Sequence, residues 1–145
     1  MRILHIEDYD KEKGKDYSEA LKRLIDCDHI EYLSDLFDLE LDYDFIIMDG
    51  QFPLKKGHEP DVMSFFEAIS FLKKKGFELS KVIVWSNSTR VHAFCFENNL
   101  RYFSKKEMRE EDYIKKGIDV KVIAKKASEE DIVEMLISLT KKSRS

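Results

Sequence analysis

The chain contains few cysteines, prolines and glycines, the residues that mark disulfide-rich proteins, cysteine-bound metal sites and flexible linkers between domains. Its 145 residues include two cysteines, two prolines and five glycines. Cys27 and Cys95 are far apart and fit no metal-binding or redox spacing, so we expect reduced thiols in a cytoplasmic protein. There is no linker rich in proline or glycine, no internal repeat and no low-complexity tract. Residues 1–145 are therefore expected to form a single domain.

Long hydrophobic runs and an excess of positive charge are also missing. No apolar run reaches the length that spans a membrane. The first residues become acidic at Glu7, so we expect neither a membrane segment nor a signal peptide. The net charge of -4 argues against a protein that binds nucleic acid by broad neutralisation of phosphates.

Short apolar segments that alternate with helical patterns are what the chain does contain. Five segments rich in Ile, Val or Phe predict strands. They are residues 2–6, 29–33, 45–48, 81–85 and 120–124. Apolar residues at helical spacing predict helices after the first strand (from Tyr17), after the third (from Val62 to near Gly76) and after the last (from Ser128). A short helix over 34–41 and another over 88–98 complete an alternation that predicts a parallel sheet.

Polar residues follow four of these strands where each strand ends. Glu7 and Asp8 follow the first strand, Asp49 the third, Ser86 the fourth and Lys125 the fifth. With the strand order 2-1-3-4-5, the first and third strands are neighbours at the edge where open parallel sheets bind ligands. Three carboxylates then converge, with a hydroxyl on one side and an ammonium group beyond it.

Clustered carboxylates raise one another's pKa values unless a cation joins them. An oxygen-only site with few protein ligands suits Mg²⁺, which keeps several of its waters. Asp49 can offer one oxygen to the metal and the other to an electrophile, and a carboxylate can attack a phosphoryl group. The ion, Lys125 and the Ser86 hydroxyl would offset charge on the transferred phosphoryl oxygens.

These segments together resemble the receiver domain of response regulators in two-component signalling. ILHIED resembles the first strand with its acidic pair, DFIIMDGQFPLKKG the phosphoacceptor strand, KVIVWSN the strand of the switch hydroxyl, and VKVIAKKASEEDIVEML the strand of the family lysine with the last helix. The resemblance covers nearly the whole chain in the family's order. It implies a flavodoxin-like α/β fold, a three-layer αβα sandwich with a five-stranded parallel sheet in the order 2-1-3-4-5.

The resemblance also implies roles for the strand-end residues. Asp49 would be the phosphoacceptor, Ser86 the switch hydroxyl and Lys125 the phosphate partner. The implied ligands of Mg²⁺ are Asp8, Asp49 and the backbone carbonyl of Gln51, with Glu7 acting directly or through water.

The implied partners are proteins. The phosphodonor would be a histidine kinase or a histidine phosphotransfer protein, and a downstream protein would read the state of the domain. No direct nucleic-acid or membrane partner is expected, and a homodimer stays open. The only catalysis expected is Mg²⁺-dependent self-phosphorylation and dephosphorylation.

The chain departs from the family at several positions. Lys126 stands where a proline is usual, and Asn87 replaces a small residue and would crowd the approach to the phosphate. Residues 99–117 read as an insertion between the fourth and fifth strands. A second register is open, in which Lys105 is the family lysine and Tyr102 the aromatic residue of the fifth strand. We prefer Lys125, because the terminal helix follows it directly.

Two other functions compete with a phosphorylated receiver. The departures above favour a pseudo-receiver, which has the same fold but serves as an interaction module that phosphorylation does not regulate. The pair Asp8 and Asp10 instead allows a phosphatase-like enzyme, with Asp8 as nucleophile and Asp10 as acid. That reading leaves Asp49 without a role.

Overall fold

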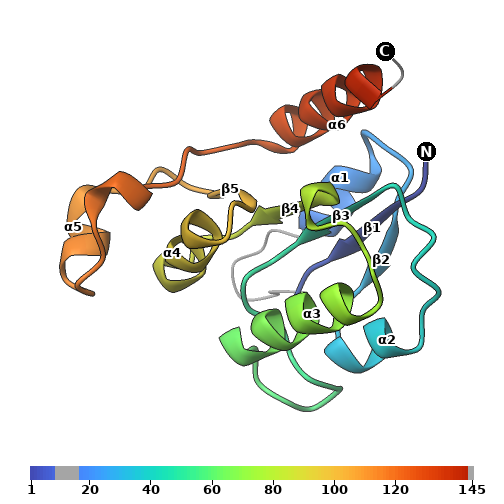
Figure 1. The fold of residues 1–145 in the computed structure, drawn as a ribbon, viewed down its shortest axis with the longest axis horizontal. Helices are drawn as coiled ribbons and strands as arrows, with labels where there is room; N and C mark the ends of the chain where they lie inside the picture. Colours follow the sequence, from blue (N-terminus) through green and yellow to red (C-terminus); the bar gives the residue numbers. More distant parts are fainter. Residues whose placement is uncertain (9–16, 144–145) are drawn as a thin grey trace.

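A parallel sheet lies at the centre of the molecule. The computed structural model describes residues 1–8 and 17–143. Within them, five parallel strands form one sheet in the order β2-β1-β3-β4-β5 (Figure 1). The strands are β1 (Ile3–Ile6), β2 (Asp28–Ile30), β3 (Phe45–Met48), β4 (Val82–Trp85) and β5 (Arg101–Phe103). The predicted fold class and strand order are confirmed: the fold is a flavodoxin-like α/β fold.

Both faces of the sheet are covered, as the nearly continuous apolar character of the central strands predicts. Successive residues of β3 point to opposite faces, so Ile46 and Met48 pack in one core cluster while Phe45 and Ile47 pack in the other. The first cluster includes residues of α2 (Leu33–Phe37), α3 (Val62–Lys74) and α4 (Thr89–Glu97). The second includes residues of α1 (Tyr17–Lys22) and α6 (Glu129–Ser143). Figure 1 shows these two helix layers on either side of the sheet.

Local signals fix several helix ends where the sequence predicts them. The Asp61 side chain accepts a hydrogen bond from the amide of Met63 at 2.9 Å and so caps α3. This helix ends just before Gly76, whose φ of +77° favours glycine. At the start of α6, the amide of Ser128 donates to Asp131 at 2.8 Å, and the amide of Asp131 donates to Ser128 Oγ at 3.2 Å. This reciprocal pair is a capping box, and it starts α6 where the sequence predicts a helix, from Ser128.

The prediction of the fifth strand is wrong. Residues 120–122 form a 3-10 helix, η2 (Val120–Val122), and β5 lies within the segment 99–117 that reads as an insertion. The apolar segment VKVIA resembles a buried strand in sequence, but it does not pair with the sheet. Val122 and Ala124 are buried outside the sheet ladder, while Val120 and Ile123 are exposed. The chain returns to the sheet edge only at an isolated bridge between Ser104 and Lys126.

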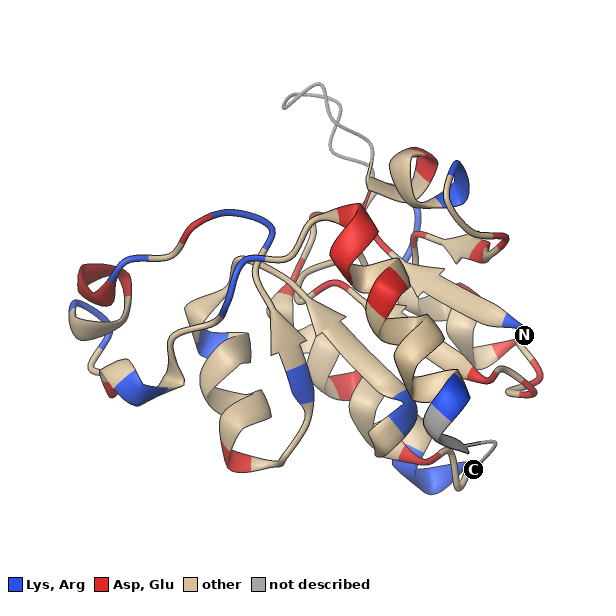
Figure 2. Ribbon diagram, turned by 90° about the horizontal axis from the view of Figure 1, so that it is seen from above, with Lys and Arg blue, Asp and Glu red and all other residues tan. Residues whose placement is uncertain are grey.

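The extra chain therefore lies after β5, not before it. We call residues 104–128 the β5–α6 connection; it contains α5 (Glu110–Ile114) and η2. Met108, Tyr113 and Val122 form a small core of their own, with Ala93 of α4 packed against it. Figure 2 shows basic and acidic residues alternating along the connection. The short 3-10 helix η1 (Leu79–Lys81) leads into β4. None of the described helices has the length and hydrophobicity to cross a lipid bilayer.

Candidate functional site

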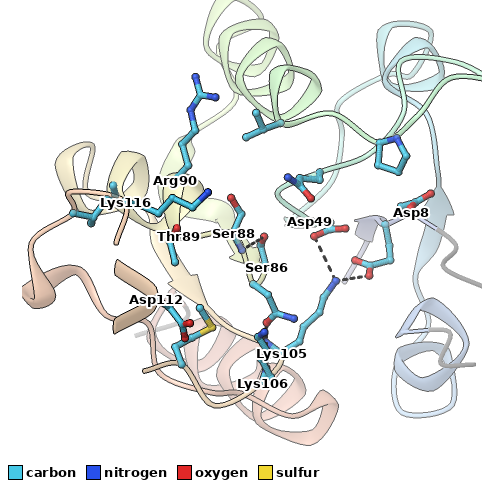
Figure 3. Close-up of a pocket in the computed structure, with 18 of the residues that line it drawn as sticks. Asp8, Asp49, Ser86, Ser88, Thr89, Arg90, Lys105, Lys106, Asp112 and Lys116 are labelled. Carbon is cyan, nitrogen blue, oxygen red and sulfur yellow. Dashed lines mark hydrogen bonds and ion pairs between the residues drawn. The ribbon is translucent and has the colours of Figure 1, made fainter. Parts of the chain in front are cut away.

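A cavity of about 1090 Å³ opens where the strands end. Parallel strands present their carboxyl ends at the same edge of the sheet, so residues that follow different strands meet there (Figure 3). The structure brings together five of the predicted site residues, which all line this cavity: Glu7, Asp8, Asp49, Gln51 and Ser86. A lysine also lines the cavity. It comes shortly after β5, which the structure places at Arg101–Phe103.

That lysine is Lys105. Its ammonium group forms an ion pair with Glu7, and its Nζ lies 3.4 Å from Oδ1 of Asp49. The three side chains are 6%, 3% and 15% exposed, respectively, for Lys105, Glu7 and Asp49. One buried cation thus faces two acidic side chains that the sequence brings from β1 and β3.

Lys125 does not reach this site. Its side chain is exposed, and its backbone carbonyl accepts a hydrogen bond from the amide of Ser104 at 2.9 Å. The preference for Lys125 over Lys105 fails for the same reason as the strand prediction, because Lys125 does not follow a strand of the sheet. The alternative register, with Tyr102 in β5 and Lys105 just after it, matches the structure.

Burial sets the ionisation of the two carboxyl groups. Desolvation raises the pKa of Glu7 to about 7, although Lys105 acts to lower it. Desolvation, with the added repulsion of Glu7, raises the pKa of Asp49 to about 7. Oε2 of Glu7 makes no hydrogen bond within the described part of the chain, but it lies 3.5 Å from Nε2 of His5, a histidine that is 0% exposed. Lys105 pairs with both carboxyl groups but does not fully offset the cost of burying them.

Lys105 itself stays charged. Burial lowers its pKa, but Asp49 and Glu7 outweigh burial, and the pKa is raised. Two aromatic rings surround the ammonium group, because Nζ lies 4.5 Å from the ring centroid of Tyr17 and 5.5 Å from that of Trp85. The only tryptophan of the chain is therefore a direct reporter of the charge at this site.

Asp49 is held by hydrogen bonds to β1 and to the next residue of its own loop. Its amide donates to the carbonyl of Ile6 at 2.8 Å, and its Oδ1 accepts from the amide of Gly50 at 2.7 Å. Glycine is needed at position 50, because a Cβ there would lie 2.4 Å from Ser86 Oγ. In Figure 3, one oxygen of Asp49 faces Lys105, and the other points toward the side of the cavity where Asp8 lies.

Ser86 lies at the end of β4 and is 2% exposed. Its Oγ accepts a hydrogen bond from the amide of Ser88 at 3.1 Å. Ser88 in turn caps α4, since its Oγ accepts from the amide of Val91 at 3.3 Å. The close approach of Gly50 and the start of α4 together fix the Ser86 hydroxyl beside the Asp49 strand end.

Asn87 has a structural role that the sequence did not reveal. Its Oδ1 accepts hydrogen bonds from the amides of Lys105 at 2.8 Å and Lys106 at 3.1 Å. The side chain therefore ties the end of β4 to the turn that carries the lysine. The sequence does not predict this role, because it requires knowing that β5 ends just before Lys105.

Asp8, Asp49 and Gln51, three of the four ligands that the resemblance implies for Mg²⁺, line the cavity, and the fourth, Glu7, is paired with Lys105. Among residues 1–8 and 17–143, no group of three or more His, Cys, Asp or Glu side chains is arranged to hold a metal ion. Mg²⁺ needs only one or two carboxylates, because it keeps several waters. Asp8, Asp49 and Gln51 line one cavity and offer such a set. Glu7 already pairs with Lys105, so we expect it to act through water.

The phosphatase-like alternative depends on Asp10, which lies outside the described residues. Asp8 lines the cavity, but so does Asp49, which that alternative does not use.

No protein-family model matches the chain, and no curated protein matches it significantly.

Proposed function

We propose that the chain is a receiver domain that accepts a phosphoryl group on Asp49. The observation that carries this proposal is the placement of Lys105 beside Asp49, 3.4 Å away, in a cavity that Glu7, Asp8 and Ser86 also line. A carboxylate nucleophile, an ammonium group and a hydroxyl at one sheet edge are the groups that phosphoryl transfer to a carboxylate requires.

The reaction needs little beyond positioning and charge compensation. One oxygen of Asp49 attacks the phosphorus of a phosphohistidine or of a small acyl phosphate. The bond between phosphorus and the donor's nitrogen or oxygen breaks, the donor keeps the electron pair, and an acyl phosphate forms on Asp49. Lys105 and the Ser86 hydroxyl stabilise charge on the phosphoryl oxygens. A bound Mg²⁺, held by Asp8, Asp49 and the carbonyl of Gln51, would neutralise part of the same charge.

The proposed partners follow from this chemistry. A histidine kinase or a histidine phosphotransfer protein supplies the phosphoryl group, and a downstream protein recognises the phosphorylated state. The β5–α6 connection is the part of this chain that a minimal five-stranded receiver would lack, and we propose that it contributes to the surface that binds these partners. We propose a cytoplasmic location, in keeping with the reduced thiols expected for Cys27 and Cys95.

Binding of beryllofluoride, a mimic of a phosphoryl group on a carboxylate, tests the proposal. We expect saturable, Mg²⁺-dependent binding with a change in Trp85 fluorescence, since the Trp85 ring lies 5.5 Å from Lys105 Nζ. Asp49→Asn, Asp8→Ala and Lys105→Met should abolish the change. Lys125→Ala is the matched control and should bind as the wild type does. A wild-type protein that shows neither a fluorescence change nor calorimetric heat contradicts the proposal.

The pseudo-receiver is the second candidate, and one observation favours it. Lys105 already pairs with Glu7 and Asp49, so the site is partly neutralised without any ion. Under this alternative, Mg²⁺ and beryllofluoride leave the fluorescence of Trp85 unchanged, while the protein remains folded and binds its partner equally well with Asp49→Asn.

A further inference from the structure

A buried histidine connects the proposed phosphoryl site to the β5–α6 connection. His92 lies in α4 and is 0% exposed. Its Nε2 lies 2.6 Å from the backbone carbonyl oxygen of Ser86, and its Nδ1 lies 2.8 Å from the hydroxyl of Tyr113 in α5. The three residues form one continuous chain of hydrogen bonds from the end of β4 to α5.

The partners of His92 determine its tautomer. The carbonyl of Ser86 can only accept, so Nε2 carries the hydrogen and donates it. Nδ1 is then an acceptor, and the hydroxyl of Tyr113 donates to it. The same hydroxyl oxygen accepts from the amide of Ala124 at 3.0 Å. Burial lowers the pKa of His92, in agreement with a neutral ring.

Tyr113 is the anchor of the β5–α6 connection. It is 0% exposed and packs with Met108 and Val122 in the small core of this segment. A second aromatic hydroxyl makes a parallel link, because Tyr102 donates to the carbonyl of Val122 at 2.7 Å. Only Tyr113 reaches a nitrogen of His92 with its hydroxyl, although the Tyr102 ring stacks on the imidazole with centroids 5.5 Å apart.

We propose that His92 is a positioning residue for Ser86 and that, through Tyr113, it couples the Asp49 site to the β5–α6 connection. The part that concerns phosphorylation rests on the proposed function. The Ser86 hydroxyl is engaged by the amide of Ser88. A ligand on Asp49 that takes over this hydroxyl changes the conformation of residue 86, whose carbonyl His92 holds. The displacement then reaches Tyr113 through two hydrogen bonds.

Two tyrosine variants separate this coupling from simple packing. Tyr113→Phe removes the hydroxyl that bonds His92 and keeps the ring. Tyr102→Phe is the matched control, because it removes a part-buried hydroxyl that bonds the same segment without touching a His92 nitrogen. The readout is hydrogen exchange of the amides of residues 108–124, with and without Mg²⁺ and beryllofluoride. Binding should change these exchange rates in the wild type and in Tyr102→Phe by roughly tenfold, the factor that corresponds to about 1.4 kcal/mol.

In Tyr113→Phe, beryllofluoride should still bind, but the exchange change over residues 108–124 should disappear. A His92→Gln variant tests the other link and should lose the same response. If Tyr113→Phe transmits the change as well as Tyr102→Phe does, the proposed coupling is wrong.

A ligand-free experiment keeps this proposal separate from the proposed function. Gly50→Ala pushes on Ser86 and, less closely, on Val91 of α4, since the added Cβ would lie 2.4 Å from Ser86 Oγ and 2.9 Å from Cγ2 of Val91. This change should alter exchange over residues 108–124 in the wild-type background and have no such effect with Tyr113→Phe. If beryllofluoride fails to bind but Gly50→Ala acts through Tyr113, phosphorylation is refuted and the coupling stands. If beryllofluoride binds and neither perturbation reaches residues 108–124, the coupling is refuted and phosphorylation stands.

Discussion

Nζ of Lys105 lies 3.4 Å from Oδ1 of Asp49 and also forms an ion pair with Glu7. Two acids therefore share one buried lysine. Burial raises the pKa of each carboxyl group to about 7, and repulsion from Glu7 adds to the rise at Asp49. An uncompensated buried charge is costly, so the site is poised to take up either a proton or a further cation.

Removing Lys105 should destabilise the protein strongly. Lys105→Met leaves Glu7 and Asp49 without a cation and should lower the free energy of unfolding by roughly 3 kcal/mol, the range found when one partner of a buried ion pair is removed. Lys125→Ala, at an exposed side chain, should change it by less than about 0.5 kcal/mol. Urea denaturation at neutral pH measures both. Equal effects of the two changes would mean that Lys105 is not the buried partner.

Neutralising Asp49 should stabilise the protein without metal. Asp49→Asn leaves one base, Lys105, for one acid, Glu7, and should raise the free energy of unfolding by on the order of 2 kcal/mol at about pH 8. Glu59→Gln, at an exposed acid of the loop beside the site, is the control and should change little. Thermal denaturation in the presence of a chelator gives the comparison, and a destabilised Asp49→Asn would contradict the pKa values given above.

The gain from Asp49→Asn should depend on pH with a definite sign. The ordinary pKa of Asp is 3.8, and the folded-state value is about 7. Between these values the folded state binds more protons than the unfolded state, so wild-type stability from this group falls as pH rises from about 4 to about 7. The advantage of the variant should therefore grow over this window and level off above it. Unfolding measured at several pH values provides the profile, and an advantage that shrinks as pH rises would contradict it.

Mg²⁺ should stabilise the wild type more at high pH than at low pH. Below about pH 6, the Glu7 and Asp49 carboxyl groups hold protons that compete with the ion; above about pH 7.5 they do not. The increase in melting temperature on adding Mg²⁺ should therefore rise with pH and disappear in Asp8→Ala. An increase that is independent of pH, or that survives in Asp8→Ala, would place the ion elsewhere.

Position 50 should tolerate only glycine. In Gly50→Ala, the new Cβ would lie 2.4 Å from Ser86 Oγ and 2.9 Å from Cγ2 of Val91, so the end of β4 or the start of α4 must move. We expect a loss of roughly 1–3 kcal/mol, as for other overpacked sites. Ser86→Gly should recover part of it, because it removes two of the three clashing atoms. Chemical denaturation of the single and double variants tests this, and additive losses would argue against the contact.

The centre of the fold could be predicted from the sequence because its signals are local. β1, β3 and β4 are apolar runs whose residues are buried on both faces of the sheet. Each ends at a polar residue, and parallel strands bring those ends together without further information. Glu7, Asp49 and Ser86 were found on this basis.

The edge of the sheet could not be predicted in the same way. β5 has three residues, Arg101–Phe103, and is only half-buried, so it carries no continuous apolar run. Residues 120–124 are richer in β-branched side chains, but Val122 packs on Tyr113 and Met108 instead of on β4, and Val120 and Ile123 are exposed. Tertiary packing overrides β-propensity here. Because the fifth strand was predicted at the wrong place, the sequence pointed to Lys125, whereas Lys105 is the lysine beside Asp49.

Intact-protein mass spectrometry after incubation with Mg²⁺ and a small acyl phosphate tests phosphorylation of Asp49 directly. We expect the wild type to gain the mass of one phosphoryl group, peptide mapping to place it on Asp49, and Asp49→Asn to gain nothing. A wild type that gains no mass, or an Asp49→Asn variant that gains as much as the wild type, would contradict it.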